Sequence, residues 1–418
     1  MDTLTSNSSS ARAAELAARD SYGRLLALLS AASHDVTAAE DALGDAFEQA
    51  VRTWPVQGVP ATPDAWLLTV ARNRLRDRWR AAEYRRTLAL DPERDAPIHL
   101  DDVDVDAIPD RRLELMLVCA HPAIDRAMHT PLMLNTVLGF TAEQIGRAFS
   151  VPAATMATRL VRVKKRIRTT GIPFRLPDRD DLPPRMAAVL EAVYGAYVID
   201  RTETGPEALH LAEVLAALVP DDPEARGLAA LVQLSAARAV ARTGPDGRFV
   251  PLADQDPARW DRRLIGRAHE HLRAAHTHGR LGRFQVEAAI QALHCTGSPE
   301  VRTLLDLHRI LQDLAPSLGG GVALAAVTAE AEGPASGLAR LDALMSEAGE
   351  AASRFQPARA TRAHLLASLG RHDEAVAEYE QAIALTADSA ERAHLRNLRA
   401  VEGSRHAARN QQGSYRGP

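Results

Sequence analysis

The chain has 418 residues, enough for two to four domains that each bury a core of their own. Hydrophobic residues make up 46% of it, yet no apolar run reaches the roughly 18 residues of a membrane span, which excludes a membrane-spanning class. The net charge of −4 argues against a uniformly basic nucleic-acid binder, and the only cysteines, Cys119 and Cys295, exclude a disulfide framework and favour the cytoplasm.

Helical periodicity runs along nearly the whole chain without convincing strand alternation, so we predict an all-α protein. Prolines and shifts in composition mark the predicted boundaries. The predicted parts are a disordered tail (1–12), a helical domain (13–90), a flexible acidic linker (91–110), a helix-turn-helix domain (111–172), an α-helical extension (173–402) and a second disordered tail (403–418).

The charges are distributed in blocks. Residues 72–86 contain seven arginines against two acids, and residues 159–168 contain six basic residues and no acid. Between these blocks, residues 91–110 carry eight carboxylates against one arginine. Two basic patches joined by an acidic connector are typical of a protein that holds nucleic acid at two points.

The first domain contains two candidate functional helices. Thr37 and Glu40 have the spacing of a capping box, which predicts a helix start there. Its predicted core stripe is Ala39, Leu43, Phe47 and Val51, and its predicted exposed acids are Glu40, Asp41, Asp45 and Glu48. A second helix over residues 65–80 carries a ladder of arginines, which fits either a nucleic-acid-binding face or an ordinary solvated face.

A helix-turn-helix is predicted between Thr141 and Arg168. Thr141 and Gln144 form a capping box, and Pro152 is suited to begin the second helix after a short turn. The predicted core stripe of the second helix is Met156, Leu160, Val163 and Ile167. The residues expected to point outward toward base edges are Thr155, Thr158, Arg159, Arg162 and Lys165. Lys164, Arg166 and Arg168 are expected to hold phosphates.

The segment GFTAEQIGRAFSVPAATMATRLVRVKKRIR, residues 139–168, resembles region 4 of extracytoplasmic-function sigma factors of the sigma-70 superfamily. That resemblance implies that the second helix reads the −35 promoter element and that the domain contacts the β flap of RNA polymerase. Gln144 stands where the family usually has Glu, and Gly146 where it usually has Ala. Neither position is expected to face DNA.

The first domain resembles sigma region 2. AEDALGDAFEQAV, residues 39–51, is similar to the segment that docks on the β′ clamp helices of core RNA polymerase, which implies contacts by Asp41, Asp45 and Phe47; Gly44 replaces a common Gln. AWLLTVARNRLRDRWR, residues 65–80, is similar to the part that captures the −10 element. The residues implied to hold the displaced strand are Arg72, Asn73, Arg76 and Arg80, with residues 57–64 receiving a flipped base.

The extension departs from sigma factors of this class, which usually end soon after region 4. Residues 118–134, 254–265 and the end of the chain resemble a subgroup with a fused helical extension that regulates in place of an anti-sigma factor. In residues 364–385, Gly370, Ala375, Tyr379 and Ala382 have a tetratricopeptide-like spacing, so we expect such a fold near residues 322–400. The extension is expected to contact a protein partner or the sigma domains themselves.

No catalytic, cofactor or metal site is predicted. His269, His271, His276 and His278 lie within ten residues, and Cys119 lies near His121, but neither group has the spacing of a zinc site. The leading hypothesis is therefore an alternative sigma factor without enzymatic activity. The alternatives are a free-standing helix-turn-helix regulator, which leaves the first domain unexplained, and a helical scaffold or enzyme, which makes both basic patches incidental.

Overall fold

The computed structural model describes residues 21–85, 111–149, 151–172, 174, 181–199, 205–297, 299–386 and 388–414. Within these ranges every regular element is a helix, apart from one isolated bridge pair between Thr243 and Phe249, which confirms the predicted all-α class. No helix in this part of the chain is long and apolar enough to cross a membrane. The chain divides into two compact units, residues 1–211 and 212–418. The predicted first tail and acidic linker lie outside the described residues.

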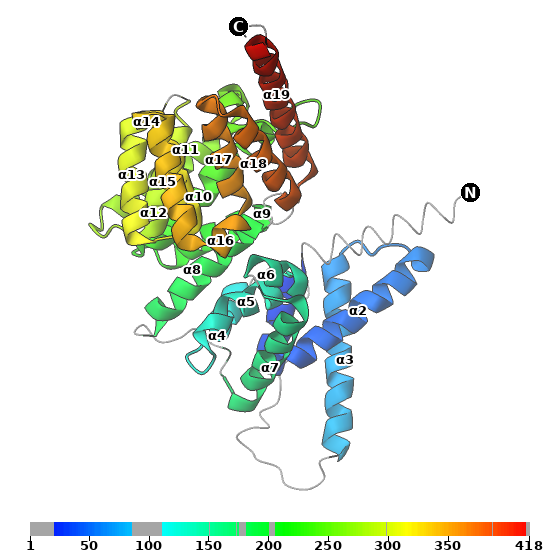
Figure 1. Ribbon diagram of the computed structural model, residues 1–418. Helices are drawn as coiled ribbons and strands as arrows, with labels where there is room; N and C mark the ends of the chain where they lie inside the picture. Colours follow the sequence, from blue (N-terminus) through cyan, green and yellow to red (C-terminus); the bar gives the residue numbers. More distant parts are fainter. Residues whose placement is uncertain are drawn as a thin grey trace. The chain divides into compact units, whose positions relative to one another are not determined.

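The first unit begins, in its described part, with helical residues 21–33. It continues with α2 (Val36–Gln57), α3 (Pro63–Arg85), α4 (Arg112–Cys119), α5 (Arg126–Thr136), α6 (Ala142–Ala148), α7 (Ala153–Thr170) and α8 (Leu182–Ile199). Helix α3 packs beside α2, while α7 contacts α2, α5 and α6 (Figure 1). Buried aliphatic side chains such as Leu43, Leu67 and Leu132 fill the interior of this unit.

The predicted boundary at Pro173 does not separate the compact units. Helix α8 follows that point and packs against α4 and α5, where the Arg185 guanidinium donates to the Leu117 carbonyl at 3.5 Å. Val189 and Val193 of α8 are completely buried. The prolines that suggested a domain boundary therefore mark only a connection, and α8 covers apolar surface that α5 would otherwise expose.

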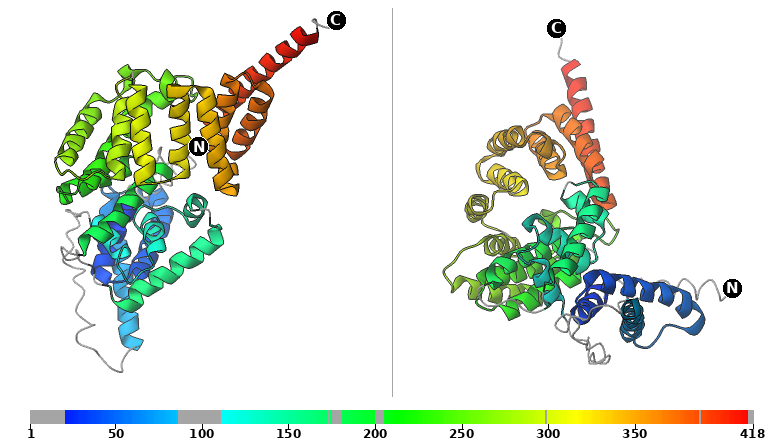
Figure 2. Two further views of the ribbon diagram at one scale, coloured as in Figure 1. Left: turned by 60° about the vertical axis from the view of Figure 1, so that its left-hand side comes forward. Right: turned by 90° about the horizontal axis from the view of Figure 1, so that it is seen from below.

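The second unit is a succession of helices. After α9 (Gly205–Leu218), at the division between the units, come α10 (Pro223–Ala237), α11 (Arg262–His276), α12 (Arg283–His294), α13 (Val301–Leu314), α14 (Leu318–Glu332), α15 (Pro334–Ala348), α16 (Glu350–Ser353), α17 (Gln356–Ser368), α18 (His372–Leu385) and α19 (Ser389–Ser414). The 3-10 turns Ala239–Arg242, Leu252–Asp254 and Pro257–Arg259 lie between α10 and α11. Viewed end-on, the helices from α12 to α18 follow one another along an arc (Figure 2).

Two apolar clusters hold this arc together, and α14 contributes to both. Leu324 and Val327 belong to a cluster with α12 and α13, whereas Val322 and Ala325 belong to a cluster with α15, α17 and α18. A helix that is apolar on all sides is buried on all sides, and the composition of α14 fits that rule. Each helix hairpin in the arc thus depends on its neighbours for burial.

The α17–α18 hairpin has the residue pattern noted in the sequence. Gly370 has a φ of 72° in the turn, a conformation that glycine adopts without a Cβ penalty. Ala375, Tyr379 and Ala382 are all buried in the cluster around α15 and α17. The spacing therefore places a small residue at the turn and three core residues on one face of α18.

The predicted disordered tail from Gly403 is wrong as far as Ser414, because α19 runs through it. Glu402 is buried and accepts hydrogen bonds from His372 at 2.6 Å and from Arg405 at 2.7 Å. Leu395 packs in the same cluster as Tyr379. Asp388 caps the start of α19, and Leu395, Leu398 and the buried Glu402 hold its first half, beyond which the polar sequence continues as helix.

Two glycines inside helices give a test of this packing. A Cβ at Gly227 of α10 would lie 2.6 Å from the Gln285 amide nitrogen of α12, whereas a Cβ at Gly266 of α11 meets nothing within 4 Å. We expect Gly227→Ala to destabilise the protein by about 1–3 kcal/mol and Gly266→Ala to stabilise it by about 0.5–1 kcal/mol. Thermal unfolding of both variants measures this, and equal shifts in Tm would contradict the α10–α12 contact.

Candidate nucleic-acid interface

The two helices predicted between Thr141 and Arg168 are present as α6 (Ala142–Ala148) and α7 (Ala153–Thr170). The Thr141 hydroxyl accepts from the Gln144 amide at 3.2 Å, and the Gln144 side chain accepts from the Thr141 amide at 2.9 Å, so the capping box is complete. Pro152 is the N-cap residue of α7 rather than its first helical residue. On α7, Met156, Leu160 and Ile167 are buried as predicted, and Val163 is half-buried.

Gly146 of α6 allows the turn that leads into α7 to pack directly against α6. The amide of Val151 donates to the Gly146 carbonyl at 2.8 Å, so the turn folds back directly onto α6. A Cβ at position 146 would lie 2.5 Å from the Val151 carbonyl oxygen and 3.4 Å from the Ala153 Cα. This geometry explains why glycine stands here, since an alanine would push the turn away from α6.

The predicted base-reading side chains form the outer face of α7. Thr155, Thr158, Arg159, Arg162 and Lys165 are all exposed. The Thr158 hydroxyl also donates to the Ala154 carbonyl at 2.9 Å. Within the described residues, no ion pair holds Arg159, Arg162 or Lys165. The face is therefore cationic and accessible, which suits contact with the edges and phosphates of a duplex.

Of the three cations expected to hold phosphates, Lys164 is shielded from solvent, whereas Arg166 and Arg168 are exposed. Lys164 is largely buried and donates to Glu40 of α2 at 2.5 Å and to Asn135 of α5 at 2.7 Å. Arg166 donates to the Ala123 carbonyl at 2.7 Å, and Arg168 lies 3.9 Å from the Asp35 carboxylate. Each of the three cations has a partner in another part of the first unit, and Arg166 and Arg168 stay exposed to solvent beside theirs.

The second predicted DNA face lies on α3. Asn73 and Arg80 are exposed, while Arg72 and Arg76 are half-buried, so the four residues predicted to hold a single strand lie on one side of the helix and its edge. The Trp66 ring lies edge-on to the Trp54 ring of α2, with 5.5 Å between centroids. This aromatic contact fixes the start of α3 next to the loop that follows Gln57.

The start of α2 corrects the first predicted capping box. Asp35, and not Thr37, is the N-cap residue: its carboxylate accepts from the Thr37 amide at 3.0 Å and the Ala38 amide at 3.1 Å. Val51, predicted for the core, is 52% exposed. Steps of four residues turn by about 400°, so a row built only from such steps drifts around the helix.

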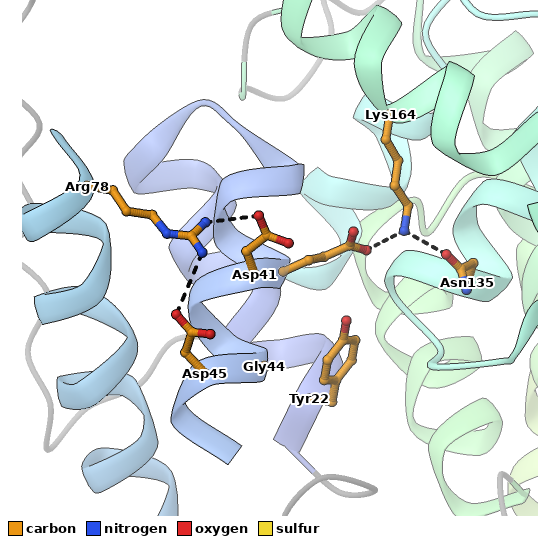
Figure 3. Close-up of a pocket in the computed structure, with 8 residues that line it drawn as sticks. Tyr22, Asp41, Gly44, Asp45, Arg78, Asn135 and Lys164 are labelled. Carbon is orange, nitrogen blue, oxygen red and sulfur yellow. Dashed lines mark hydrogen bonds and ion pairs between the residues drawn. The ribbon is translucent and has the colours of Figure 1, made fainter. Parts of the chain in front are cut away.

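The acidic face of α2 is paired in this structure (Figure 3). Arg78 of α3 donates to Asp41 at 2.9 Å and lies 3.6 Å from the Asp45 carboxylate. Phe47 is half-buried and stacks on Tyr22, with ring centroids 6.4 Å apart. Glu40 is less exposed than predicted, and burial raises its pKa even though the Lys164 cation acts in the opposite direction.

Cys119 and His121 contribute to the fold of the first unit. His121 accepts from the Ala123 amide at 3.1 Å, while the Cys119 thiol lies against Thr136, and burial raises the pKa of that thiol to about 12. Among the described residues, no three His, Cys, Asp or Glu side chains form a group that could hold a metal ion. Cys119 is therefore a buried core residue, and His121 stabilises the turn that follows it.

The segment at residues 254–265 builds a corner. Asp261 caps α11 through the Arg263 amide at 2.9 Å, and Trp260 is buried. Arg259 donates to the carbonyls of Val240 at 2.6 Å and Thr243 at 3.1 Å. The charged residues Arg259 and Asp261 thus stabilise the connection between α10 and α11.

Comparison with known proteins assigns two parts of the chain. Residues 18–85 match the family model of sigma-70 region 2, and residues 185–276 match a family of unknown function (DUF6596). An uncharacterized protein of Rhizobium meliloti (strain 1021) is 35% identical over 379 residues, which cover 86% of this chain and 88% of that protein. This chain and the Rhizobium protein are members of one family. No solved structure matches the chain.

The turn glycine provides a test of the interface. Gly146→Ala is expected to displace the α6–α7 turn, lower the free energy of unfolding by about 1–3 kcal/mol and weaken DNA binding. The matched control is Gly44→Ala in α2, where a Cβ meets nothing within 4 Å and helix propensity improves by about 1 kcal/mol. Circular dichroism melts and DNA titrations measure both effects. Unchanged DNA affinity in Gly146→Ala would show that the turn does not position α7.

Proposed function

We propose that the chain, whose residues 18–85 match sigma-70 region 2, is an alternative sigma factor of the extracytoplasmic-function type that acts in transcription initiation. In this proposal α2 docks on the β′ clamp helices of core RNA polymerase through Asp41, Asp45 and Phe47. Helix α3 captures the −10 element and α7 reads the −35 element, with the β flap next to α7. The protein then acts in the cytoplasm, where the polymerase works, and it carries no catalytic residue of its own.

The observation that carries this proposal is the combination of a region 2 match with a complete helix-turn-helix. Residues 18–85 match the polymerase-binding and −10-binding part of sigma-70 proteins. The exposed Thr and Arg side chains of α7 supply a second, separate DNA-binding face. A free-standing regulator needs only the second of these faces, so the presence of both favours the sigma factor.

The residues proposed to contact DNA and those proposed to contact polymerase lie on different helices, α7 and α2. Arg159 and Arg162 are exposed and meet no acid among the described residues, so they are suited to bases and phosphates. Asp41 and Asp45 lie on α2 and pair with Arg78 of α3, so neither acid takes part in the exposed face of α7. A loss of DNA contacts should therefore leave polymerase binding intact.

We predict that Arg159→Ala/Arg162→Ala abolishes promoter-specific transcription while the variant still co-purifies with core RNA polymerase. Each lost contact should cost about 1–3 kcal/mol of promoter binding and lower the salt dependence by about one counterion. The matched control is Arg248→Ala/Arg354→Ala, which removes the same charge from exposed positions of the second unit. Loss of core binding in the first variant would contradict the assigned roles.

The extension is proposed to regulate the sigma domains or to bind a partner through a tetratricopeptide-like arc. Its truncation needs a cut that respects α8. A chain ending at Thr170 removes α8 and uncovers the buried faces of α4 and α5, whereas a chain ending at Ile199 keeps them covered.

We expect the chain ending at Ile199 to remain folded and to bind promoter DNA with core polymerase, and the chain ending at Thr170 to melt at a clearly lower temperature. The reason is the burial of Val189, Val193 and Leu190 of α8, about 1.5–3 kcal/mol for each large side chain. Differential scanning fluorimetry and transcription assays compare the two. Equal melting temperatures would show that α8 belongs to the extension instead.

A further inference from the structure

The second unit carries a third block of positive charge, to which the proposed function gives no role. Residues 262–283 contain six arginines and four histidines against one acid, Glu270. Most of this block is α11, which packs on α10 and touches α12 (Figure 1). The region 2 match ends at residue 85, and α11 lies within the match to the family of unknown function. The block is therefore a feature of the extension that still needs an explanation.

Helix α11 divides into an apolar side and a cationic side. Leu264 and Ile265 are among its buried residues. At about 100° per residue, four exposed side chains fall within about 60° of one another on the opposite side: Arg262, His269, Arg273 and His276. We call these four residues the α11 stripe. At about 1.5 Å per residue it extends about 21 Å along the helix.

The arginines of the α11 stripe are available to a partner. Among the described residues, no ion pair holds Arg262 or Arg273, and Arg262 donates to the Pro257 carbonyl at 3.3 Å. Glu270, the one acid of α11, lies about 60° round the helix from Arg273 and pairs with neither arginine. An exposed cationic row without acids of its own attracts an anionic partner.

Gly266 interrupts the stripe between Arg262 and His269, and the packing of the fold does not require a glycine there. A Cβ at this position meets nothing within 4 Å, whereas a Cβ at Gly227 of α10 would lie 2.6 Å from the Gln285 amide nitrogen. A glycine inside a helix costs stability relative to alanine, but it lets another backbone approach closely from outside. The stripe thus has a bare position among its cations, which suits a sugar-phosphate backbone.

The chemistry of this face favours DNA over a small anion or a protein. A row of about 21 Å is too long for one phosphate group, but duplex DNA carries one charge per about 1.7 Å of its axis. Stable protein interfaces have an apolar or aromatic centre, and no large apolar side chain of α11 is exposed. Arginine and histidine donors without apolar neighbours are suited to phosphate oxygens, which position a protein on DNA without reading its sequence.

We propose that the α11 stripe is a DNA-binding surface of the second unit, which holds the phosphate backbone of a duplex without sequence readout. This inference goes beyond the proposed function, in which α3 and α7 bind DNA, and it does not require either helix to recognise a promoter. Such a surface strengthens binding to every duplex alike. Its contribution falls steeply with salt, because each arginine–phosphate contact releases a condensed counterion.

The full-length chain titrated with a mixed-sequence duplex at several salt concentrations tests this surface by fluorescence anisotropy. Arg262→Ala/Arg273→Ala is expected to weaken binding about tenfold at low salt and to reduce the salt slope by about two. The matched control is Arg248→Ala/Arg354→Ala, which removes the same charge from exposed positions of the second unit and should change neither quantity. Unchanged affinity and slope in the Arg262→Ala/Arg273→Ala variant overturn the proposal.

The position of Gly266 gives a test in which stability and binding change in opposite directions. Gly266→Leu is expected to raise the Tm, because leucine favours helix and open space surrounds the site, and to weaken DNA binding, because the new side chain keeps the DNA backbone away. Gly403→Leu in α19, where a Cβ also meets nothing within 4 Å, is the control and should leave DNA affinity unchanged. A Gly266→Leu variant that gains stability and keeps full DNA affinity overturns the proposal.

A photo-crosslinker on α11 distinguishes DNA from a protein partner. Gly266→Cys accepts a thiol-reactive benzophenone, since Cys119 and Cys295 are buried. In a mixture with core RNA polymerase and promoter DNA, crosslinking to DNA supports the proposal, and crosslinking to a polymerase subunit alone overturns it. If the chain does not bind polymerase at all, the proposed function fails, while crosslinking to the duplex alone still decides whether the α11 stripe binds DNA.

Discussion

The division of α7 into a buried stripe and an exposed face is the constraint on which the first unit depends. Met156, Leu160 and Ile167 must be covered, and α5, α6 and α2 supply the cover. The side chains on the opposite side are then necessarily exposed, and they are Thr and Arg. Lys164 lies at the edge between the two sides, where a cation can be shielded only if a carboxylate such as Glu40 comes with it.

Local features were predictable because their causes are local. The capping box of Thr141 and Gln144 and the core residues of α7 involve residues within a few turns, so periodicity and spacing determine them. Asp35 was a stronger cap than Thr37 for a local reason too: its carboxylate accepts from two amides at once. Val51 was predicted to be buried but is exposed, because a row built from steps of four residues rotates away from the core along the helix.

Contacts between distant segments had no counterpart in the sequence. Glu40 and Lys164 are 124 residues apart, and nothing in the sequence pairs this glutamate, one of many, with either of the chain's two lysines. Gly146 and Gly23 have the same property, because only the position of a carbonyl from another segment reveals why no Cβ is tolerated. The polar composition after Gly403 also led to a wrong prediction of disorder. There α19 continues as a polar helix, and the buried carboxylate of Glu402 helps to hold it.

A chain with a net charge of −4 can still bind DNA tightly, because charges act mainly within about 8–10 Å at physiological salt. Arg159, Arg162 and Lys165 form no ion pair among the described residues, and the hollow that Arg162 and Lys165 line contains one acid, Asp125, against three cations, so their local field is positive whatever the total. Arg78 and Lys164 are paired with α2 acids instead.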